Sequence, residues 1–562
     1  MADRAAGGIE TQFDLQATMR DGTVLRADAF RPTGPGPWPV LLARTPYGKQ
    51  DPGVLARLDP FGAARRGYLV IVQDCRGRFR SQGQWAPLVN EGTDGYDTIG
   101  WAANLPGADG HVGMYGPSYL GHAQLAAIRA APAQLCAAVP GFTWSDPNDG
   151  LIARGAAYEL GLVTHWTLTL GVNVLERRYA DRPTERHRRL AELNSALDGL
   201  VRHTYWQLPA DPGPTIRRLG LPTPMAGRRP TTTAGIPTLT VAGWFDAFLQ
   251  GSIDNHVRAR DGGAPAALIV GPWSHDNQTS RVGESDFGTT ADEATLAAGR
   301  SLHAYELDWL DRHLKPEPAA PPPEPTVLVF VMGTNEWRRF PAWPPESVDL
   351  AWYLHAHGGL SLDPPGPGTP PDTFRHDPSD PVPTCGGALL LPPEFPAGPC
   401  DQREVEERDD VLVYTSAPLR APLEVIGRVT VHLFAESTAL STDWVARLCD
   451  VDPDGVSRNI TDGILRTQAC HRAFAPSGHE PAAEHVIDLW STAHVFLPGH
   501  RVRLQIASSC FPRWDRNPGR PESSTIAYQC VRHDAAGPSR VILPAVRTNP
   551  VAVAGMRVFP SR

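Results

Sequence analysis

A serine, an aspartate and a histidine, each expected just after a strand, are the residues of this chain that could do chemistry together. Ser118 lies in the stretch V-G-M-Y-G-P-S-Y-L-G (112–121), where an apolar segment meets a glycine and a helix-like pattern of small residues follows. This pattern is typical of the strand–turn–helix that exposes a nucleophilic serine. The usual pentapeptide has glycine two places after the serine, whereas Leu120 holds that place here and Gly121 follows it. An ordinary turn with Ser118 capping the helix is the alternative interpretation.

The partners that a serine nucleophile needs follow it in the chain order typical of this turn. A serine hydroxyl is a weak nucleophile at neutral pH, so it needs a base, and an acid must orient that base. Asp246 follows the predicted strand 238–241, and His275 follows the next predicted strand, 267–270. Taken singly, Asp246 could be a helix cap and His275 a loop histidine. The ordered set, with each residue at the same edge of the sheet, predicts a Ser118–Asp246–His275 triad.

Two hydrogen-bond donors should face the oxygen that becomes negative when a serine attacks a carbonyl group. One is the backbone N–H of Tyr119, the residue after the serine. The second should come from the loop after an early strand, where Tyr47 carries a hydroxyl that can donate. Packing of the aromatic ring is the alternative explanation for Tyr47.

Length and composition limit the class of protein. A chain of 562 residues is too long for one core, so several domains are expected. Its net charge of −9 disfavours a general binder of nucleic acid or of an anionic membrane. We find neither a secretory signal nor an apolar run that could span a bilayer, so a cytoplasmic protein is expected.

The sequence offers no sign of a metal or a cofactor. Its eight cysteines are scattered without C-x-x-C spacing, which favours reduced and mostly buried thiols over a zinc site or a disulfide framework. No H-E-x-x-H motif or phosphate-cradling loop occurs. We therefore expect no metal and no cofactor.

Periodicity predicts a parallel α/β sheet, a helical insertion and a separate all-β region. Continuous apolar strands alternate with helices in the first part, after an antiparallel hairpin at 10–31. Helices are predicted at 91–104 and 295–314, and a last strand of the sheet at 327–331. Beyond Trp343, short alternating segments separated by proline and glycine indicate a sandwich or jelly roll. The predicted divisions are 1–144 and 234–345 for the sheet, 145–233 for the insertion and 346–562 for the β domain.

Several motifs together resemble one enzyme family. The residues that carry the resemblance are R-T-P-Y (44–47), D-C-R-G-R-F-R-S-Q-G (74–83), G-M-Y-G-P-S-Y-L-G (113–121), G-W-F-D (243–246), G-P-W-S-H (271–275) and D-W (443–444). The chain is similar to the family of cocaine esterase and the X-prolyl dipeptidyl peptidases, which also holds α-amino-acid ester hydrolases and cephalosporin acylases. The resemblance implies an α/β-hydrolase core, an inserted helical cap and a C-terminal jelly roll.

The resemblance also implies a role for each matching residue. Ser118 would be the nucleophile, His275 the base and Asp246 its orienting acid, with Tyr47 and the Tyr119 amide as the oxyanion hole. The family's acyl pocket would be lined by Phe248, with Trp144 and Trp166 as contributors. Asp74 and Arg76 match a signature that we interpret as a structural ion pair near the site.

The substrate remains open at this stage. The aromatic residues favour a carboxylic-ester hydrolase for a small-molecule substrate. An X-Pro dipeptidyl peptidase or amino-acid ester hydrolase would need carboxylates for an α-ammonium group, for which Asp276 and Glu159 are the candidates. Transfer of the acyl group to an alcohol or amine is a third alternative, and an inactive binding protein is a fourth, which the intact triad disfavours. A homo-oligomer is compatible with the sequence.

Overall fold

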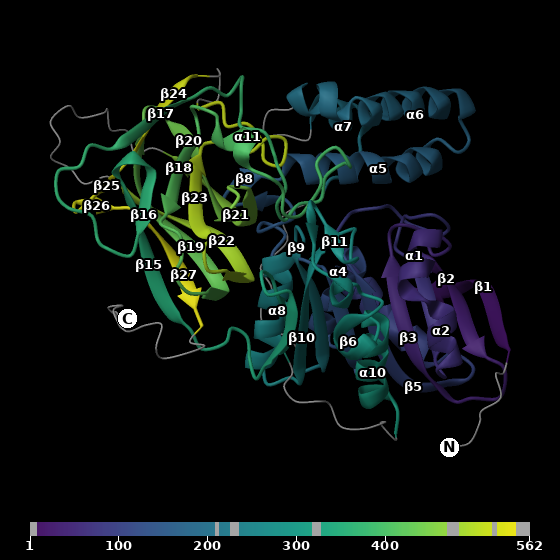
Figure 1. The fold of residues 1–562 in the computed structure, drawn as a ribbon. Coiled ribbons are helices and arrows are strands. Elements are labelled where there is room, and N and C mark those ends of the chain that lie inside the picture. The colour runs from purple at the N-terminus through teal and green to yellow at the C-terminus, as the bar shows by residue number, and fades with distance from the viewer. Residues whose placement is uncertain are drawn as a thin grey trace.

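Two bodies lie side by side in the computed structural model, one built of strands and helices and the other of strands alone (Figure 1). The structure describes residues 8–207, 213–224, 235–316, 327–468, 483–519 and 525–546. The predicted boundary at 233 and the proline-rich connection at 316–325 fall largely outside these ranges.

One mixed sheet forms the centre of the N-terminal body. Its strand order is β1-β2-β4-β3-β5-β6-β9-β10-β13-β14, in which β4 to β13 run parallel and β1, β2 and β14 are antiparallel additions. The bounds are β1 (Ile9–Thr18), β2 (Val24–Pro32), β3 (Trp38–Thr45), β4 (Leu69–Asp74), β5 (Ala108–Pro117), β6 (Leu135–Gly141), β9 (Thr238–Phe245), β10 (Ala266–Ser274), β13 (Val327–Val331) and β14 (Glu336–Phe340). The predicted N-terminal hairpin is confirmed, whereas β14 was not predicted.

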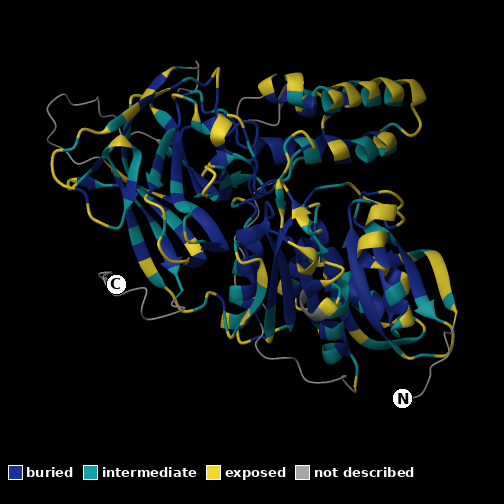
Figure 2. Ribbon diagram, in the orientation of Figure 1, coloured by how far each residue is buried: buried dark blue, intermediate teal, exposed yellow. Residues whose placement is uncertain are grey.

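Helices cover both faces of this sheet, as the continuous apolar strands predict. On β3, Leu41 packs into the core that includes α10, while Val40 and Leu42 pack into the core of α3 and α4 on the other face. Figure 2 shows the strands buried between these layers. The helices are α1 (Pro52–Leu58), α2 (Pro60–Arg65), α3 (Glu91–Ala103), α4 (Tyr119–Ala130), α8 (Leu249–Asp261), α9 (Leu296–Gly299) and α10 (Leu302–Leu314), with the short elements β11 (Arg281–Val282), β12 (Ser285–Asp286) and η3 (Thr289–Ala291).

The single helix predicted over 295–314 is wrong, because the chain breaks within it. Gly299 has a φ of +70°, which ends α9. Ser301 then caps α10, since its Oγ accepts a hydrogen bond from the backbone N–H of Ala304 at 3.2 Å.

A helical insertion lies between β6 and β9 and covers the upper end of the sheet in Figure 1. Its elements are β7 (Ala153–Arg154), β8 (Ala157–Tyr158), α5 (Leu160–Arg178), α6 (Pro183–Asp198), η1 (Leu200–Thr204), η2 (Tyr205–Gln207) and α7 (Gly213–Leu219). Leucines such as Leu168, Leu175 and Leu193 form a small core, to which Phe511 of the β domain also belongs. The insertion is predominantly helical, as predicted.

Where the structure describes it, the C-terminal body is built of strands with two short helical turns, and it encloses a large apolar core to which Val431, Leu448 and Ile506 belong. Its strands follow the order β17-β24-β19-β27-β15-β16-β18-β23-β20-β21, with β22 paired to β19. The bounds are β15 (Val348–His355), η4 (Ala356–Gly358), β16 (Gly359–Ser361), β17 (Asp372–His376), α11 (Arg403–Glu406), β18 (Leu412–Ser416), β19 (Leu423–Ser437), β20 (Ser441–Val451), β21 (Ser457–Gln468), β22 (Ala483–Phe496), β23 (Arg501–Ala507), β24 (Ala527–Val531), β25 (His533–Asp534), β26 (Gly537–Pro538) and β27 (Arg540–Ala545).

Backbone pairing and a shared apolar core join the two bodies. Met332, which directly follows β13, donates its N–H to Ala493 O and accepts from Val495 N–H. The first sheet is thereby joined by backbone hydrogen bonds to β22 of the second sheet. The adjoining core contains Trp244 of β9 together with Trp490 of the β domain. The interface is therefore part of the folded core.

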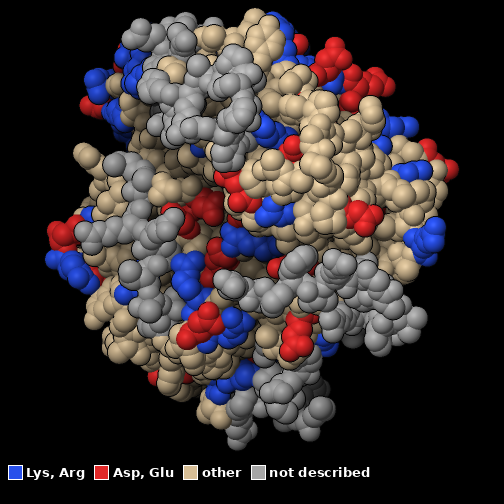
Figure 3. Space-filling model, turned by 90° about the vertical axis from the view of Figure 1, so that its left-hand side faces the viewer, with Lys and Arg blue, Asp and Glu red and all other residues tan. Residues whose placement is uncertain are grey.

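Charges of both signs are mixed on the face that the β domain presents (Figure 3). Figure 3 views the side formed by the β domain, where acidic and basic side chains are interspersed among uncharged residues. No helix in the described part of the chain combines the length and the apolar character needed to cross a membrane.

Truncation after Pro345 should expose this shared core. We expect a fragment of residues 1–345 to aggregate, because removal of the β domain uncovers the apolar surface around Trp244. The measurement is the soluble, monomeric fraction by size-exclusion chromatography, with the full-length chain as control. A soluble, monomeric fragment whose α/β part stays folded would contradict a shared core.

Candidate active site

Ser118 lies alone between β5 and α4, on a backbone turn that few residues adopt. Its φ is 61° and its ψ is −126°. The backbone N–H of Ser118 donates to Gly141 O at 2.8 Å, which ties the turn to β6. The Ser118 side chain makes no capping hydrogen bond to α4, so the interpretation of this serine as a helix cap is wrong.

Two glycines make room for the turn. A Cβ on Gly116, whose φ is +119°, would lie 2.8 Å from Leu120 Cδ2. A Cβ on Gly121 would lie 2.9 Å from the side chain of Thr143, so this glycine lets α4 approach the chain after β6. Gly121, which stands one position later than the glycine of the usual pentapeptide, therefore allows close packing of α4.

The three residues of the predicted triad meet at the carboxyl edge of the sheet. His275 Nε2 lies 3.1 Å from Ser118 Oγ, and His275 Nδ1 lies 2.7 Å from Asp246 Oδ1. The Asp246 side chain has no solvent exposure. Helix α8 begins later, with Phe248 at its N-cap position, so the helix-cap interpretation of Asp246 is also wrong.

This arrangement can move a proton. The imidazole can take the hydroxyl proton at Nε2, while the buried carboxylate fixes the tautomer and stabilises the imidazolium. The position of His275 is supported by Gln278, whose Nε2 donates to His275 O at 2.9 Å, and by the edge-to-face contact with the Phe248 ring at 5.1 Å.

Both predicted donors lie beside the serine. Tyr47 lies on the same cavity wall as Ser118, and its hydroxyl accepts a hydrogen bond from Trp166 Nε1 at 3.3 Å. Burial raises the pKa of Tyr47, so its hydroxyl keeps its proton at neutral pH and can donate. Tyr119 is the first residue of α4, and the first N–H groups of a helix have no intrahelical acceptor.

A buried polar chain anchors the side chain of Tyr119. Its hydroxyl donates to Glu91 Oε1 at 2.9 Å and accepts from the N–H of Leu88 at 3.0 Å. Glu91 Oε2 in turn pairs with Arg44 at 2.7 Å, and neither charged side chain is more than 2% exposed. The start of α4 is thus fixed to α3 and β3, a connection that sequence reasoning missed.

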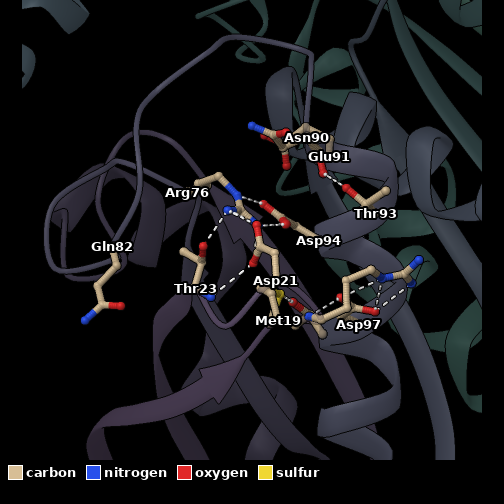
Figure 4. Close-up of polar contacts among 12 residues, drawn as sticks. Met19, Asp21, Thr23, Arg76, Gln82, Asn90, Glu91, Thr93, Asp94 and Asp97 are labelled. Atoms are coloured by element: carbon tan, nitrogen blue, oxygen red, sulfur yellow. Dashed lines mark hydrogen bonds and ion pairs between the residues drawn. The ribbon is translucent and has the colours of Figure 1, made fainter.

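The network continues outward through Arg76. Figure 4 shows Arg76 between Asp21 of the first hairpin and Asp94 of α3, at 2.7 and 2.5 Å. The predicted ion pair of Arg76 with Asp74 is not formed. Asp74 accepts instead from the backbone N–H of Lys49 at 2.7 Å, and burial raises its pKa to about 6.

A cavity of about 650 Å³ opens at the serine. Its wall includes Ser118, His275 and the three residues predicted for the pocket, namely Trp144, Trp166 and Phe248. The β domain also contributes, since Leu390 lines the same cavity.

Of the two carboxylates considered for an ammonium group, only Asp276 reaches the cavity. Asp51 and Glu176 line it as well, although nothing in their sequence context signalled this. Glu159 is absent from the cavity wall, which corrects the expectation for this residue. It is buried, and its Oε1 accepts from Trp514 Nε1 of the β domain at 2.8 Å.

Known proteins share both halves of this structure. The model of the X-Pro dipeptidyl-peptidase (S15 family) matches residues 21–277, and that of the X-Pro dipeptidyl-peptidase C-terminal non-catalytic domain matches residues 321–542. A cocaine esterase from Rhodococcus sp. (strain MB1 Bresler) is 33% identical over 583 residues, covering 96% of this chain and 99% of that protein. The chain belongs to the X-Pro dipeptidyl-peptidase (S15) family.

Solved structures agree with this membership. An aminopeptidase from the marine sediment archaeon Thaumarchaeota archaeon and an α-amino acid ester hydrolase each have a TM-score of 0.74, 25% identity and coverage of 97% of this chain and 98% of theirs. The expected α/β-hydrolase core with a C-terminal β domain is therefore confirmed for this S15-family member.

Glu159 should make the fold less stable as the pH rises. Burial raises its pKa from 4.5 to about 7, so the folded protein favours the neutral carboxyl and loses stability between these two values. Glu159→Gln keeps an acceptor for Trp514 without a charge. We expect the melting temperature of Glu159→Gln to rise relative to that of the parent between about pH 5 and pH 8. The difference corresponds to about 3 kcal/mol in the free energy of unfolding.

The surface variant Glu404→Gln is the matched control and should follow the parent at every pH. Equal pH profiles for Glu159→Gln and the parent would contradict a buried, ionising Glu159.

Proposed function

We propose that this protein is a serine hydrolase that cleaves carboxylic esters through an acyl-enzyme on Ser118. The observation that carries the proposal is the pair of contacts made by His275, 3.1 Å to Ser118 Oγ and 2.7 Å to Asp246 Oδ1, at the mouth of a cavity. The relative named as a cocaine esterase and the structural neighbour named as an α-amino acid ester hydrolase support ester cleavage.

Each group has a defined step in this mechanism. Ser118 Oγ attacks the carbonyl carbon while its proton passes to His275 Nε2. The carbonyl oxygen becomes negative and is stabilised by the Tyr47 hydroxyl and the Tyr119 N–H. His275 then protonates the leaving alcohol, and in the second half it activates water to release the acid from Ser118.

The cavity wall favours an apolar or aromatic acyl group. Trp144, Trp166 and Phe248 present rings to the space beside the serine, and Leu390 adds an aliphatic surface. Burial of such a group against these side chains would supply binding free energy without a specific polar contact.

Amide or peptide cleavage is the second candidate, supported by Asp276. This carboxylate follows the proposed base and lines the cavity, where it could pair with an α-ammonium group. The structural neighbour named as an aminopeptidase favours the same direction. Acyl transfer to an alcohol or amine would use the same acyl-enzyme with a different acceptor.

A substrate panel with a nucleophile variant tests the proposal. Purified parent protein is assayed against aryl esters, amino-acid esters and X-Pro anilides, and we expect the highest kcat/KM for aryl esters. Ser118→Ala should lower kcat by at least about 10³-fold and abolish labelling by a fluorophosphonate probe, because the triad acts as a unit.

Ser195→Ala, on the exposed face of α6, is the control and should retain parental turnover. Undiminished turnover by Ser118→Ala would refute the nucleophile. A higher kcat/KM for X-Pro anilides would replace the esterase assignment with a peptidase.

Tyr47→Phe isolates the proposed oxyanion donor. The ring remains, so folding should be preserved, while loss of the hydroxyl should lower kcat by about 10²–10³-fold with a smaller change in KM. Steady-state kinetics with an aryl ester measures this, and Tyr96→Phe on the surface of α3 is the matched control. A parental kcat would show that other donors stabilise the oxyanion.

A further inference from the structure

A loop of the β domain reaches the catalytic cavity. The two ends of the loop 386–399 lie side by side, because Gly387 and Gly398 exchange backbone hydrogen bonds of 2.8 and 3.0 Å. Leu390 on this loop lines the cavity. Its neighbour Leu391 packs so closely on α5 that a Cβ on Gly161 would lie 2.0 Å from Leu391 Cδ2. We call residues 386–399 the wall loop.

Two cysteines face each other across the base of the wall loop. Cys385 and Cys400 lie two positions outside the Gly387–Gly398 pair, one on each side. A Cβ on Gly386, the neighbour of Cys385, would lie 2.9 Å from Cys400 Sγ. The Gln402 amide fixes the pair, because its Nε2 lies 3.0 Å from Cys385 O and 3.1 Å from Cys400 O. It also donates to Cys385 Sγ at 3.4 Å.

The two thiols differ in a way that suits a reactive cysteine and its resolving partner. Cys385 is partly exposed, and the neighbouring Cys400 thiol, together with the Arg447 guanidinium, lowers its pKa. Cys400 is buried, and the neighbouring Cys385 raises its pKa. That cause disappears once the Cys385 thiolate has been oxidised, so Cys400 then becomes the better nucleophile.

We propose that Cys385 and Cys400 are a redox modification site, at which a hydroperoxide forms a disulfide that closes the wall loop at its base. The Cys385 thiolate attacks one peroxide oxygen, the O–O bond breaks, and Cys385 becomes a sulfenic acid as hydroxide (from hydrogen peroxide) leaves. Cys400 sulfur then attacks the sulfenic sulfur, the S–S bond forms, and the S–O bond breaks. The released oxygen leaves as water with the Cys400 proton, so two thiols lose two electrons and the peroxide gains them.

The disulfide would restrain Leu390 beside the catalytic serine. Cross-linking the two ends of a loop removes alternative conformations of that loop, and a pre-organised wall binds substrate with a smaller entropic loss. This consequence rests on the proposed ester hydrolysis, whereas formation of the bond does not.

The bond itself is tested on the full-length protein with hydrogen peroxide. After alkylation of the remaining thiols, mass spectrometry of proteolytic peptides should show Cys385 linked to Cys400, and dithiothreitol should reverse the link. Cys400→Ser should leave Cys385 as a sulfenic acid that a dimedone probe captures. Cys136→Ser, which removes the other partly exposed thiol among the described cysteines, is the control and should form the link normally.

Two results would overturn the site. One is the absence of a Cys385–Cys400 link in oxidised parent protein while Cys385 is overoxidised to a sulfinic acid. The other is a link of Cys385 to Cys510, the buried thiol that contacts Thr384 Oγ1 at 3.6 Å.

The effect on the cavity has a separate readout. We expect oxidation to lower the KM of an aryl ester by about twofold or more, with recovery after dithiothreitol and no change in Cys385→Ser. An unchanged KM in protein that carries the link would overturn the connection to the cavity and leave the modification site in place. Lack of turnover in reduced protein would count against the proposed function alone.

Discussion

The positive-φ turn at Ser118 is the constraint on which the candidate site and the N-terminal body around it depend. A non-glycine residue in such a conformation costs about 1–3 kcal/mol and persists only where its surroundings hold it. Here the hydrogen bond from Ser118 N–H to Gly141 O and the close packing around Gly116 and Gly121, where a side chain would not fit, hold it. The parallel strands β5 and β6 and the helix α4 thus together stabilise the unusual backbone conformation of Ser118.

The buried ion pair of Glu91 with Arg44 extends this support to the next layer. Removing one partner of such a pair typically costs about 3–5 kcal/mol, because the remaining charge stays buried. Glu91 also accepts a hydrogen bond from the hydroxyl of Tyr119, the residue that begins α4 beside the serine. Arg44, Glu91 and Tyr119 therefore form one hydrogen-bonded unit, which connects α3 to the candidate oxyanion hole.

The cavity is a composite of three parts of the chain. Phe248 comes from the N-terminal body, Trp166 from the helical insertion and Leu390 from the β domain. The shared core around Trp244 and Trp490 holds the third part against the first. The shape of the cavity is consequently set by inter-domain packing as much as by the residues next to the serine.

Local sequence patterns determined the candidate triad, and long-range packing decided which residues surround it. Ser118, Asp246 and His275 were predictable because each directly follows a buried strand, and parallel strands bring their carboxyl ends to one edge. The partners of Arg76 and the burial of Glu159 were not, since they depend on segments far away in the sequence. A sequence pattern records which face of an element is apolar. Which distant element covers that face, and which charge it brings, is settled only when the domains pack.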